Sequence, residues 1–136
     1  MEFTCTGHEN MLGTHKTTLE FTHDNFLTRK GDCIIGINAD FQVDQIKEFM
    51  RKEITRINQK IKITIKVDTF KDEIIAVYNT NFDHKHEMVI RKSNFTDKRT
   101  FATMADKCAA EIKREIINNM KSQKTIMKIK IEGLHE

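Results

Sequence analysis

The sequence predicts an α+β fold: a β-rich sandwich or barrel-like core of about seven to nine strands with two amphipathic helices. Three observations lead to this fold class. Several short segments alternate apolar and polar residues, two longer segments carry a helical period, and the same order of elements occurs in both halves of the chain. Each observation is taken in turn below.

Alternation with a period of two marks the strands. In IKITIKVD, residues 61–68, the apolar side chains fall on one face, and lysine, threonine and aspartate fall on the other. MKIKIEG, residues 127–133, repeats this pattern. Shorter alternations and apolar runs mark the remaining strands, at residues 3–6, 19–22, 33–37 and 74–78. The two apolar runs, CIIGI and IIAVY, are expected to be covered on both faces.

Two segments carry the helical period instead. Residues 41–59 place an apolar stripe on one face, made of Val43, Ile46, Phe49, Met50, Ile54 and Ile57. Residues 104–121 do the same with Cys108, Ala109, Ile112, Ile116 and Met120. Thr103 followed three residues later by Asp106 resembles a capping box, which predicts the start of the second helix.

The chain also echoes itself. His15-Lys16 and Asn25-Phe26 recur 69 residues later (84 − 15) as His84-Lys85 and Asn94-Phe95. Beyond these, the offset becomes 66 (105 − 39): Ala39-Asp40 matches Ala105-Asp106, and the lysine-isoleucine strands match as well. We therefore expect a duplicated unit with pseudo-twofold symmetry, with repeats at about residues 15–68 and 84–132.

Length and composition predict one domain, residues 1–136. A chain of this length buries a sizeable core without disulfides. Its longest apolar runs are too short to span a membrane, and the start of the chain does not have the pattern of a signal peptide. Cys5, Cys33 and Cys108 are odd in number and far apart, which indicates free buried thiols in the cytoplasm. The net charge of +3 is mild.

Metal binding and nucleophilic catalysis are the weaker functional interpretations. Imidazoles at His8, His15, His84 and His86 are chemically suited to a metal, but their spacing favours exposed or hydrogen-bonding histidines, and no metal or cofactor is predicted. Alternation places Cys33 with the apolar residues of its strand, and Cys108 lies on the helix stripe, so both thiols are expected in the core. Ser93 follows two cations, but no base is evident beside it.

Anion binding is the preferred interpretation. Two segments combine positive charge with hydroxyl donors, one in each half, and would converge if the halves are related. The predicted function is a site for a small phosphate or carboxylate between the halves, and the sequence leaves open whether this site is enzymatic. The residues predicted to form it are His8, His15, Lys16, Thr17, Thr18, Glu20, Arg91, Lys92, Ser93, Arg99 and Thr100. An ordinary solvated strand face is the competing explanation.

The alternative function is a non-catalytic module that binds RNA or a protein through a basic strand face. Lys62, Lys66, Lys128 and Lys130 share the polar faces of their strands. Those faces lack the aromatic residues on which unpaired bases stack, since the chain has one tyrosine and no tryptophan. The glycines at GDCIIGI lead into a strand and not into a helix, so they do not form a phosphate-binding loop.

The sequence resembles an archaeal family known as domain of unknown function 371. The residues that carry the likeness are GHEN, THKTTLE, LT, GDCIIG and AD in the first half, and IRKS, RT and ADKCA in the second. Together they cover most of the chain. The resemblance implies a cytoplasmic archaeal protein of β-rich α+β fold with two helices, and it implies no activity.

Overall fold

The computed structural model describes residues 1–135, which form one sheet of eight strands and two helices, as the sequence predicts. The order of strands across the sheet is β1-β8-β4-β5-β7-β6-β2-β3. The strands are β1 (Glu2–Thr6), β2 (Thr18–Thr22), β3 (Ile34–Gly36), β4 (Lys60–Val67), β5 (Phe70–Tyr78), β6 (Glu87–Arg91), β7 (Thr100–Thr103) and β8 (Ile126–Gly133). The helical elements are α1 (Val43–Glu53), the 3₁₀ turn η1 (Ala109–Glu111) and α2 (Arg114–Asn119).

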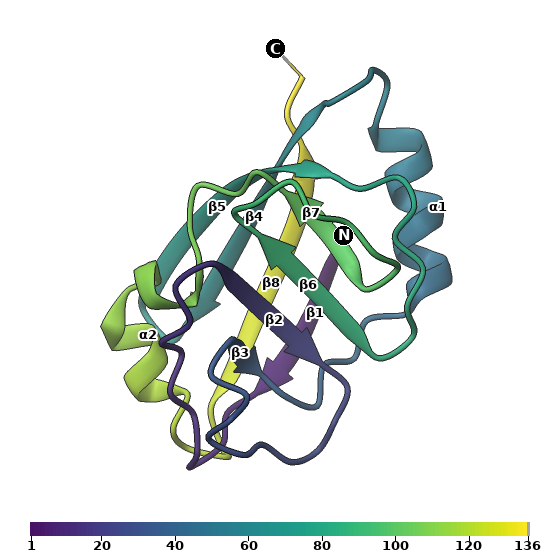
Figure 1. The fold of residues 1–136 in the computed structure, drawn as a ribbon. Helices are drawn as coiled ribbons and strands as arrows, with labels where there is room; N and C mark the ends of the chain where they lie inside the picture. The colour runs from purple at the N-terminus through teal and green to yellow at the C-terminus, as the bar shows by residue number, and fades with distance from the viewer. Residues whose placement is uncertain (136) are drawn as a thin grey trace.

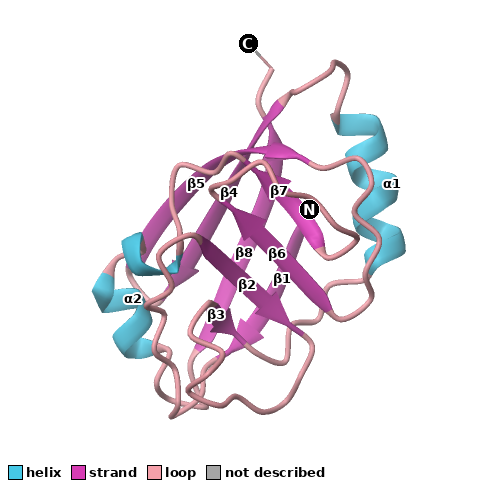
Figure 2. Ribbon diagram, viewed as in Figure 1, coloured by secondary structure: helices cyan, strands magenta, loops and turns pink. Residues whose placement is uncertain are grey.

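The sheet curves back on itself into two layers. In Figures 1 and 2, β2, β3 and β6 lie in front of β1, β8, β4 and β5, with α1 and α2 at opposite sides. The two edge strands meet at one bridge, in which Thr6 N donates to Ile37 O at 2.7 Å and Ile37 N donates to Thr6 O at 2.9 Å. The sheet is therefore strongly curved, but it is not a closed barrel.

The core lies between the two layers. Ile61, Ile63 and Ile65 of β4 are fully buried, and so are Leu19 and Phe21 of β2. These are the side chains that the alternating patterns predicted to point inward. No helix among residues 1–135 is long and apolar enough to cross a membrane.

The two helices are shorter than their sequence patterns predicted. α1 ends at Glu53, and Ile57 is 90% exposed instead of completing the apolar stripe. The expected helix over residues 104–121 is wrong for its first part. Met104 takes a left-handed φ of 53°, which ends the strand before it, and only η1 and α2 are helical in the rest of this segment.

The capping box predicted from Thr103 and Asp106 is wrong. Asp106, like Asp40, instead secures the edge of a neighbouring strand. Asp40 Oδ1 accepts from Thr4 N of β1 at 2.7 Å, and Asp40 N donates to Thr4 O. Asp106 Oδ1 accepts from Ile75 N of β5 at 3.0 Å, and Asp106 N donates to Ile75 O. These bonds satisfy backbone groups that the strand edges would leave unpaired.

The two halves repeat the same hydrogen bonds. Ala39 N donates to Thr22 O, and Ala105 N donates to Arg91 O, at offsets of 66 (105 − 39) and 69 (91 − 22). The left-handed φ of Asn38, 51°, also recurs 66 residues later at Met104. Because both offsets equal those of the sequence echo, these bonds support a duplicated unit. The proposed repeats pair at two places, β2 with β6 and β4 with β8.

Gly7 is required by a close approach of two segments. A Cβ on Gly7 would lie 2.1 Å from the carbonyl oxygen of Met120, which is backbone and cannot move aside. The end of β1 therefore packs directly on the end of α2. Gly13, in contrast, serves a turn, since its φ is +58°.

Candidate functional site

The strand pair β2–β6 has a polar face on the side away from the core, at one of the two places where the halves meet. Most of this face is covered, since Thr18, Glu20 and Thr22 are all buried. Its register places Thr18 opposite Arg91, Glu20 opposite Val89 and Thr22 opposite Glu87. Leu19 and Phe21 fill the core, so the alternate residues face outward, as predicted. We call this outer face, together with Cys33, Asp97, Arg99 and Thr100 from the flanking segments, the front junction.

Glu20 lies at the centre of the front junction and is only 6% exposed. Within residues 1–135, the one hydrogen bond to its side chain is from the Cys33 thiol, whose Sγ lies 3.7 Å from Oε1. Burial, together with the negative charge of Glu87, raises the pKa of Glu20 to about 7, although the positive charge of Arg99 acts in the opposite direction. A buried carboxyl that changes its protonation near neutral pH is a feature of sites that move protons.

Cys33 is not a core residue, contrary to its predicted place beside Ile35. It lies in the turn before β3, where the alternation of the strand has not begun, and it is partly exposed. Its thiol faces Glu20, while Cys5 and Cys108 are buried and unpaired as predicted. Burial and the charge of Glu20 raise the pKa of Cys33 to about 12, which makes the thiol a poor nucleophile.

Two arginines in the front junction are held by carboxylates. Arg99 Nη1 donates to Glu87 Oε2 at 3.0 Å, and its Nε lies 3.6 Å from Asp97 Oδ2. Arg91 Nη2 lies 3.4 Å from Asp97 Oδ2, so Arg91 pairs with Asp97 and not with Glu20. The side chain of Arg91 is 15% exposed and that of Arg99 is 42% exposed. Arg99 is therefore the arginine that a ligand reaches more easily.

Thr100 hydrogen-bonds to both Asp97 and Arg91. Its buried hydroxyl donates to Asp97 Oδ1 at 2.7 Å and accepts from Arg91 Nε at 2.9 Å. Although burial opposes it, the bond from Thr100 and the charges of Arg91 and Arg99 lower the pKa of Asp97. Asp97 thus stays ionised where Glu20 takes up a proton, and the two carboxyls have different chemical states at neutral pH.

Several predicted residues lie at one end of the β2–β6 pair. His15 Nδ1 accepts from Thr17 N at 3.2 Å, and Thr17 O accepts from Lys92 N at 2.9 Å. Lys16 is exposed beside them, and Lys92 Nζ donates to Glu111 Oε1 at 2.7 Å. The structure therefore brings Lys16, Thr17 and Lys92 together, but Lys92 already has a carboxylate partner.

His8 and Ser93 have local roles. His8 N donates to Met120 O, and its ring accepts from Asn10 N. The exposed Ser93 hydroxyl accepts from Phe95 N at 3.4 Å. Neither the His8 ring nor the His15 ring makes a hydrogen bond or ring contact with Arg91 or Arg99 among residues 1–135. The predicted convergence of histidines and arginines is thus not seen among these contacts.

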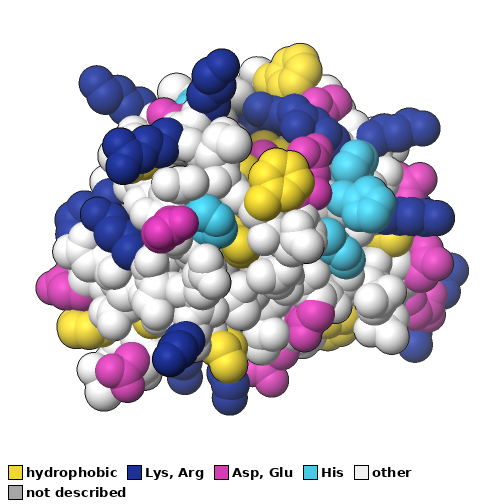
Figure 3. Space-filling model, turned by 90° about the horizontal axis from the view of Figure 1, so that it is seen from below, with side chains coloured by type: hydrophobic (Ala, Val, Ile, Leu, Met, Phe, Trp, Pro, Cys, Tyr) yellow, Lys and Arg dark blue, Asp and Glu magenta, His cyan; other side chains and the backbone are white. Residues whose placement is uncertain are grey.

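Three histidines gather at the other end of the β2–β6 pair. The ring centroids of His23 and His86 lie 5.7 Å apart, and those of His84 and His86 lie 6.2 Å apart. Figure 3 shows histidine side chains grouped on one side of the face seen from below, with acidic and basic side chains around them. In the described part of the chain, no group of three histidine, cysteine or acidic side chains is placed to hold a metal.

Phe26 and Phe95 are exposed in the two loops that flank the front junction. Phe26 is 60% exposed and follows β2, and Phe95 is 56% exposed and follows β6. Their positions differ by 69 (95 − 26), an offset of the proposed repeats. The Arg91 guanidinium carbon lies 4.9 Å from the centroid of the Phe95 ring, a cation–π contact. Both rings are therefore accessible from solvent.

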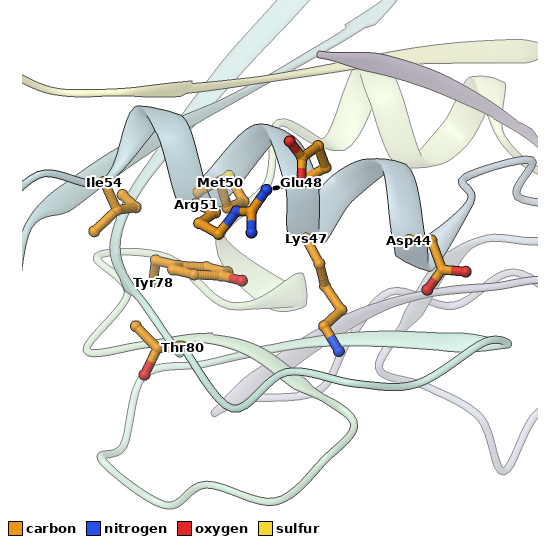
Figure 4. Close-up of a pocket in the computed structure, with 8 residues that line it drawn as sticks. All are labelled: Asp44, Lys47, Glu48, Met50, Arg51, Ile54, Tyr78 and Thr80. Atoms are coloured by element: carbon orange, nitrogen blue, oxygen red, sulfur yellow. Dashed lines mark hydrogen bonds and ion pairs between the residues drawn. The ribbon is translucent and has the colours of Figure 1, made fainter.

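A separate hollow of about 450 Å³ lies beside α1 and is a weaker candidate. Figure 4 shows Tyr78 beneath the helix with its hydroxyl directed toward Lys47. Lys47 pairs with Asp83 at 3.2 Å, and Arg51 pairs with Glu48. Both cations of this hollow are thus paired with neighbouring carboxylates. Burial raises the pKa of Tyr78, which keeps the phenol neutral.

Comparison with known proteins identifies the family. Residues 3–133 match the family described as a domain of unknown function, DUF371. The chain belongs to the DUF371 family. It is 41% identical over 123 residues to an uncharacterised protein of the archaeon Methanocaldococcus jannaschii, MJ0206, covering 89% of this chain and 90% of that protein. The family predicted from the GHEN, GDCIIG and ADKCA segments is confirmed.

Glu87 and Asp97 belong to the front junction of this DUF371 protein but were not predicted. Glu87 precedes Arg91 by four residues and therefore shares its face of the strand, a signal available in the sequence. Asp97 and Thr100 have the spacing of a side-chain-stabilised turn, which was also available. The register of β2 against β6 could not be predicted from the sequence, because no turn connects these strands directly.

Proposed function

We propose that the front junction binds a small molecule bearing a carboxylate or phosphate, and that Glu20 exchanges a proton with this ligand. The observation that carries the proposal is Glu20, a carboxyl 6% exposed whose pKa burial raises to about 7. A general acid or base works best when its pKa lies near the working pH. Glu20 meets this condition without further adjustment.

Arg99 is the proposed anchor for the anionic group. Its side chain is 42% exposed although Glu87 and Asp97 both lie beside it. A guanidinium has five N–H donors, so two carboxylate contacts leave donors for a ligand oxygen. Phe26 and Phe95 would contact the apolar part of the ligand from the flanking loops. The expected binding group is a phosphate or carboxylate because both match the planar donor fork of arginine.

A purely structural network accounts for Asp97 and Arg91, but not for Glu20. Asp97 holds Thr100 and both arginines and thereby fixes β6 against β7. Among the described residues, the Glu20 carboxyl receives a hydrogen bond only from the Cys33 thiol, which is a weak donor. Burying a carboxyl with so little compensation lowers the stability of the fold. A buried group that lowers stability in this way is typical of functional sites.

We also place this activity in the cytoplasm. The proposal is supported by three cysteines that are all unpaired, two of them buried. Thiols in this state are typical of a reducing compartment.

The test is a thermal-shift screen of small carboxylates and phosphates at pH 6, 7 and 8. A ligand at one hundred times its Kd stabilises the folded state by about 2.7 kcal/mol, which raises the Tm by several degrees for a domain of this size. We expect such a shift in the wild-type protein, and a much smaller one in Arg99→Gln. Glu20→Gln should abolish the dependence of the shift on pH. The matched control is Arg51→Gln, because Arg51 also pairs with a carboxylate but lies on α1.

The proposal fails if no carboxylate or phosphate in the panel raises the Tm. It fails equally if Arg99→Gln and Arg51→Gln respond to the ligand as the wild type does.

A further inference from the structure

A second polar surface lies at the other place where the halves meet, on the outer face of β8, β4 and β5. It contains a hollow of about 310 Å³, which we call the lysine groove. The lysines that line it are Lys62, Lys66, Lys71, Lys128 and Lys130. Glu2, Glu73 and Glu132 also line it, so the lining carries two more positive than negative charges, five against three. Figure 1 shows the helices at the sides of this sheet and not over this face.

The lysines stand side by side across the strands. Lys66 is directly opposite Lys128 of β8 on one side and Lys71 of β5 on the other. Like charges directly opposite each other destabilise a sheet. Their presence at neighbouring positions therefore lowers the stability of the unliganded protein, and a bound anion would relieve the repulsion.

Three of these ammonium groups have no ion-pair partner in the part of the chain that the structure describes. Lys71 pairs with Glu73 at 3.3 Å, and Lys62 lies 3.7 Å from both Glu73 and Glu132. In contrast, Lys66, Lys128 and Lys130 form no ion pair within residues 1–135. Neighbouring strands are about 4.8 Å apart, and alternate residues of one strand are about 7 Å apart. Three free cations thus surround a small area of the sheet.

The borders of the groove select the kind of anion. Glu2, on β1, is opposite Lys130 of β8. Glu73, on β5, is opposite Thr64 of β4, and Glu132, on β8, is opposite Lys62 of β4. These carboxylates bound the positive area and would repel a long polyanion that continued across the sheet. The lining has no aromatic side chain on which a base would stack. Lysine provides point charges, which suit phosphate oxygens in several arrangements.

We propose that the lysine groove binds a compact chain of phosphates, such as a triphosphate, through Lys66, Lys128 and Lys130. The phosphate chain is the group recognised, whether it is inorganic or part of a nucleotide. This binding is independent of the front junction, since the groove lies on a different strand pair.

Isothermal titration calorimetry with inorganic triphosphate tests the proposal. We expect wild-type protein to bind triphosphate, and the double variant Lys66→Gln/Lys128→Gln to lose at least tenfold in affinity. The matched control is Lys30→Gln/Lys124→Gln, which removes two charges from exposed lysines outside the groove and should bind as the wild type does. Glu20→Gln should also bind normally, which separates this site from the front junction.

Adenosine triphosphate and a short DNA duplex identify the source of the phosphates. Equal affinity for adenosine triphosphate and triphosphate supports recognition of the chain alone, and tighter binding of the nucleotide identifies a nucleotide as the ligand. Tighter binding of the duplex would overturn the proposal. So would no binding of triphosphate, or equal binding by the groove and control variants. The Tm of the unliganded double variant separates loss of binding from unfolding, and we expect it to be no lower than that of the wild type because both substitutions relieve the like-charge row.

Discussion

Glu20 shows how the position of one residue sets both stability and chemistry. Its carboxyl is buried between β2 and the turn that carries Cys33, where the charge of Glu87 also disfavours ionisation. In the unfolded chain the same carboxyl has an ordinary pKa, near 4.5. The folded state therefore binds a proton more tightly than the unfolded state does, and its stability depends on whether that proton is present.

Replacing Glu20 by glutamine should stabilise the protein at high pH only. Below pH 4.5 the wild-type carboxyl is neutral in both states and costs nothing. As the pH rises from about 4.5 to about 7, the folded state retains a proton that the unfolded state has lost, so wild-type stability falls. Above that window the cost is complete, on the order of 3 kcal/mol. Urea unfolding at pH 4 and pH 8 measures this difference.

The matched control for this experiment is Glu115→Gln, which removes an exposed carboxyl on α2. We expect it to change the free energy of unfolding little at either pH. A Glu20→Gln variant that gains no more stability than Glu115→Gln between pH 4 and pH 8 would show that Glu20 ionises normally.

Cys33 should report the charge of its neighbour. Because burial and the Glu20 carboxylate raise the pKa of Cys33 to about 12, its thiol should react slowly with a maleimide at pH 8 despite being partly exposed. Glu20→Gln removes the charge and should make Cys33 react faster. Mass spectrometry of the labelled peptides measures this. Equal rates in the two proteins would mean that Glu20 carries no charge near the thiol.

Asp40 and Asp106 accept hydrogen bonds from β1 and β5, so replacing either residue should lower the stability of the fold. Asp106→Ala removes the acceptor for Ile75 N, and a hydrogen bond to a charged group contributes about 1.5–3 kcal/mol. We expect a loss of stability of about this size by urea unfolding. Asp44→Ala, at an exposed position in the first turn of α1, is the control and should cost less than about 1 kcal/mol. Equal losses in the two variants would contradict the role assigned to Asp106.

The strands could be predicted from the sequence because their inner faces are uniformly apolar. Ile61, Ile63 and Ile65 alternate with polar residues, and all three are fully buried. The ends of the helix expected over residues 104–121 could not be predicted from its apolar pattern. Its apolar residues do pack into the core. However, the left-handed φ of Met104 ends β7, and Asp106 accepts a hydrogen bond from Ile75 N of β5. Tertiary hydrogen bonds therefore determine the structure of residues 104–106, although the apolar residues have helical spacing.

The whole molecule is predicted to have pseudo-twofold symmetry. We expect residues 15–65 to superpose on 84–131 in a crystal structure with the same strand order and with α1 in the place of η1 and α2. The repeated bonds at Thr22 and Arg91 support this. Different paths of the chain in the two segments would remove the duplication.

The candidate site could be predicted only in part because it depends on pairing between the halves. Alternation correctly placed Thr18 and Glu20 on one face, and the register then brought Arg91 opposite Thr18. His8 was assigned to the site from its neighbours in sequence, but its backbone is bound to the end of α2. Lys66 and Lys128 were predicted to share a polar face, while their direct opposition follows from the β4–β8 register.

The central claim is that Glu20 is a proton-exchanging group in an anion-binding site, and a carbon-13 NMR titration of its side-chain carboxyl tests this most directly. We predict a midpoint near pH 7 in the wild-type protein. We also predict a higher midpoint in Arg99→Gln, because the positive charge of Arg99 lowers the pKa of Glu20. A midpoint near 4.5, unchanged in Arg99→Gln, would contradict the account and leave the front junction as a polar surface without acid–base chemistry.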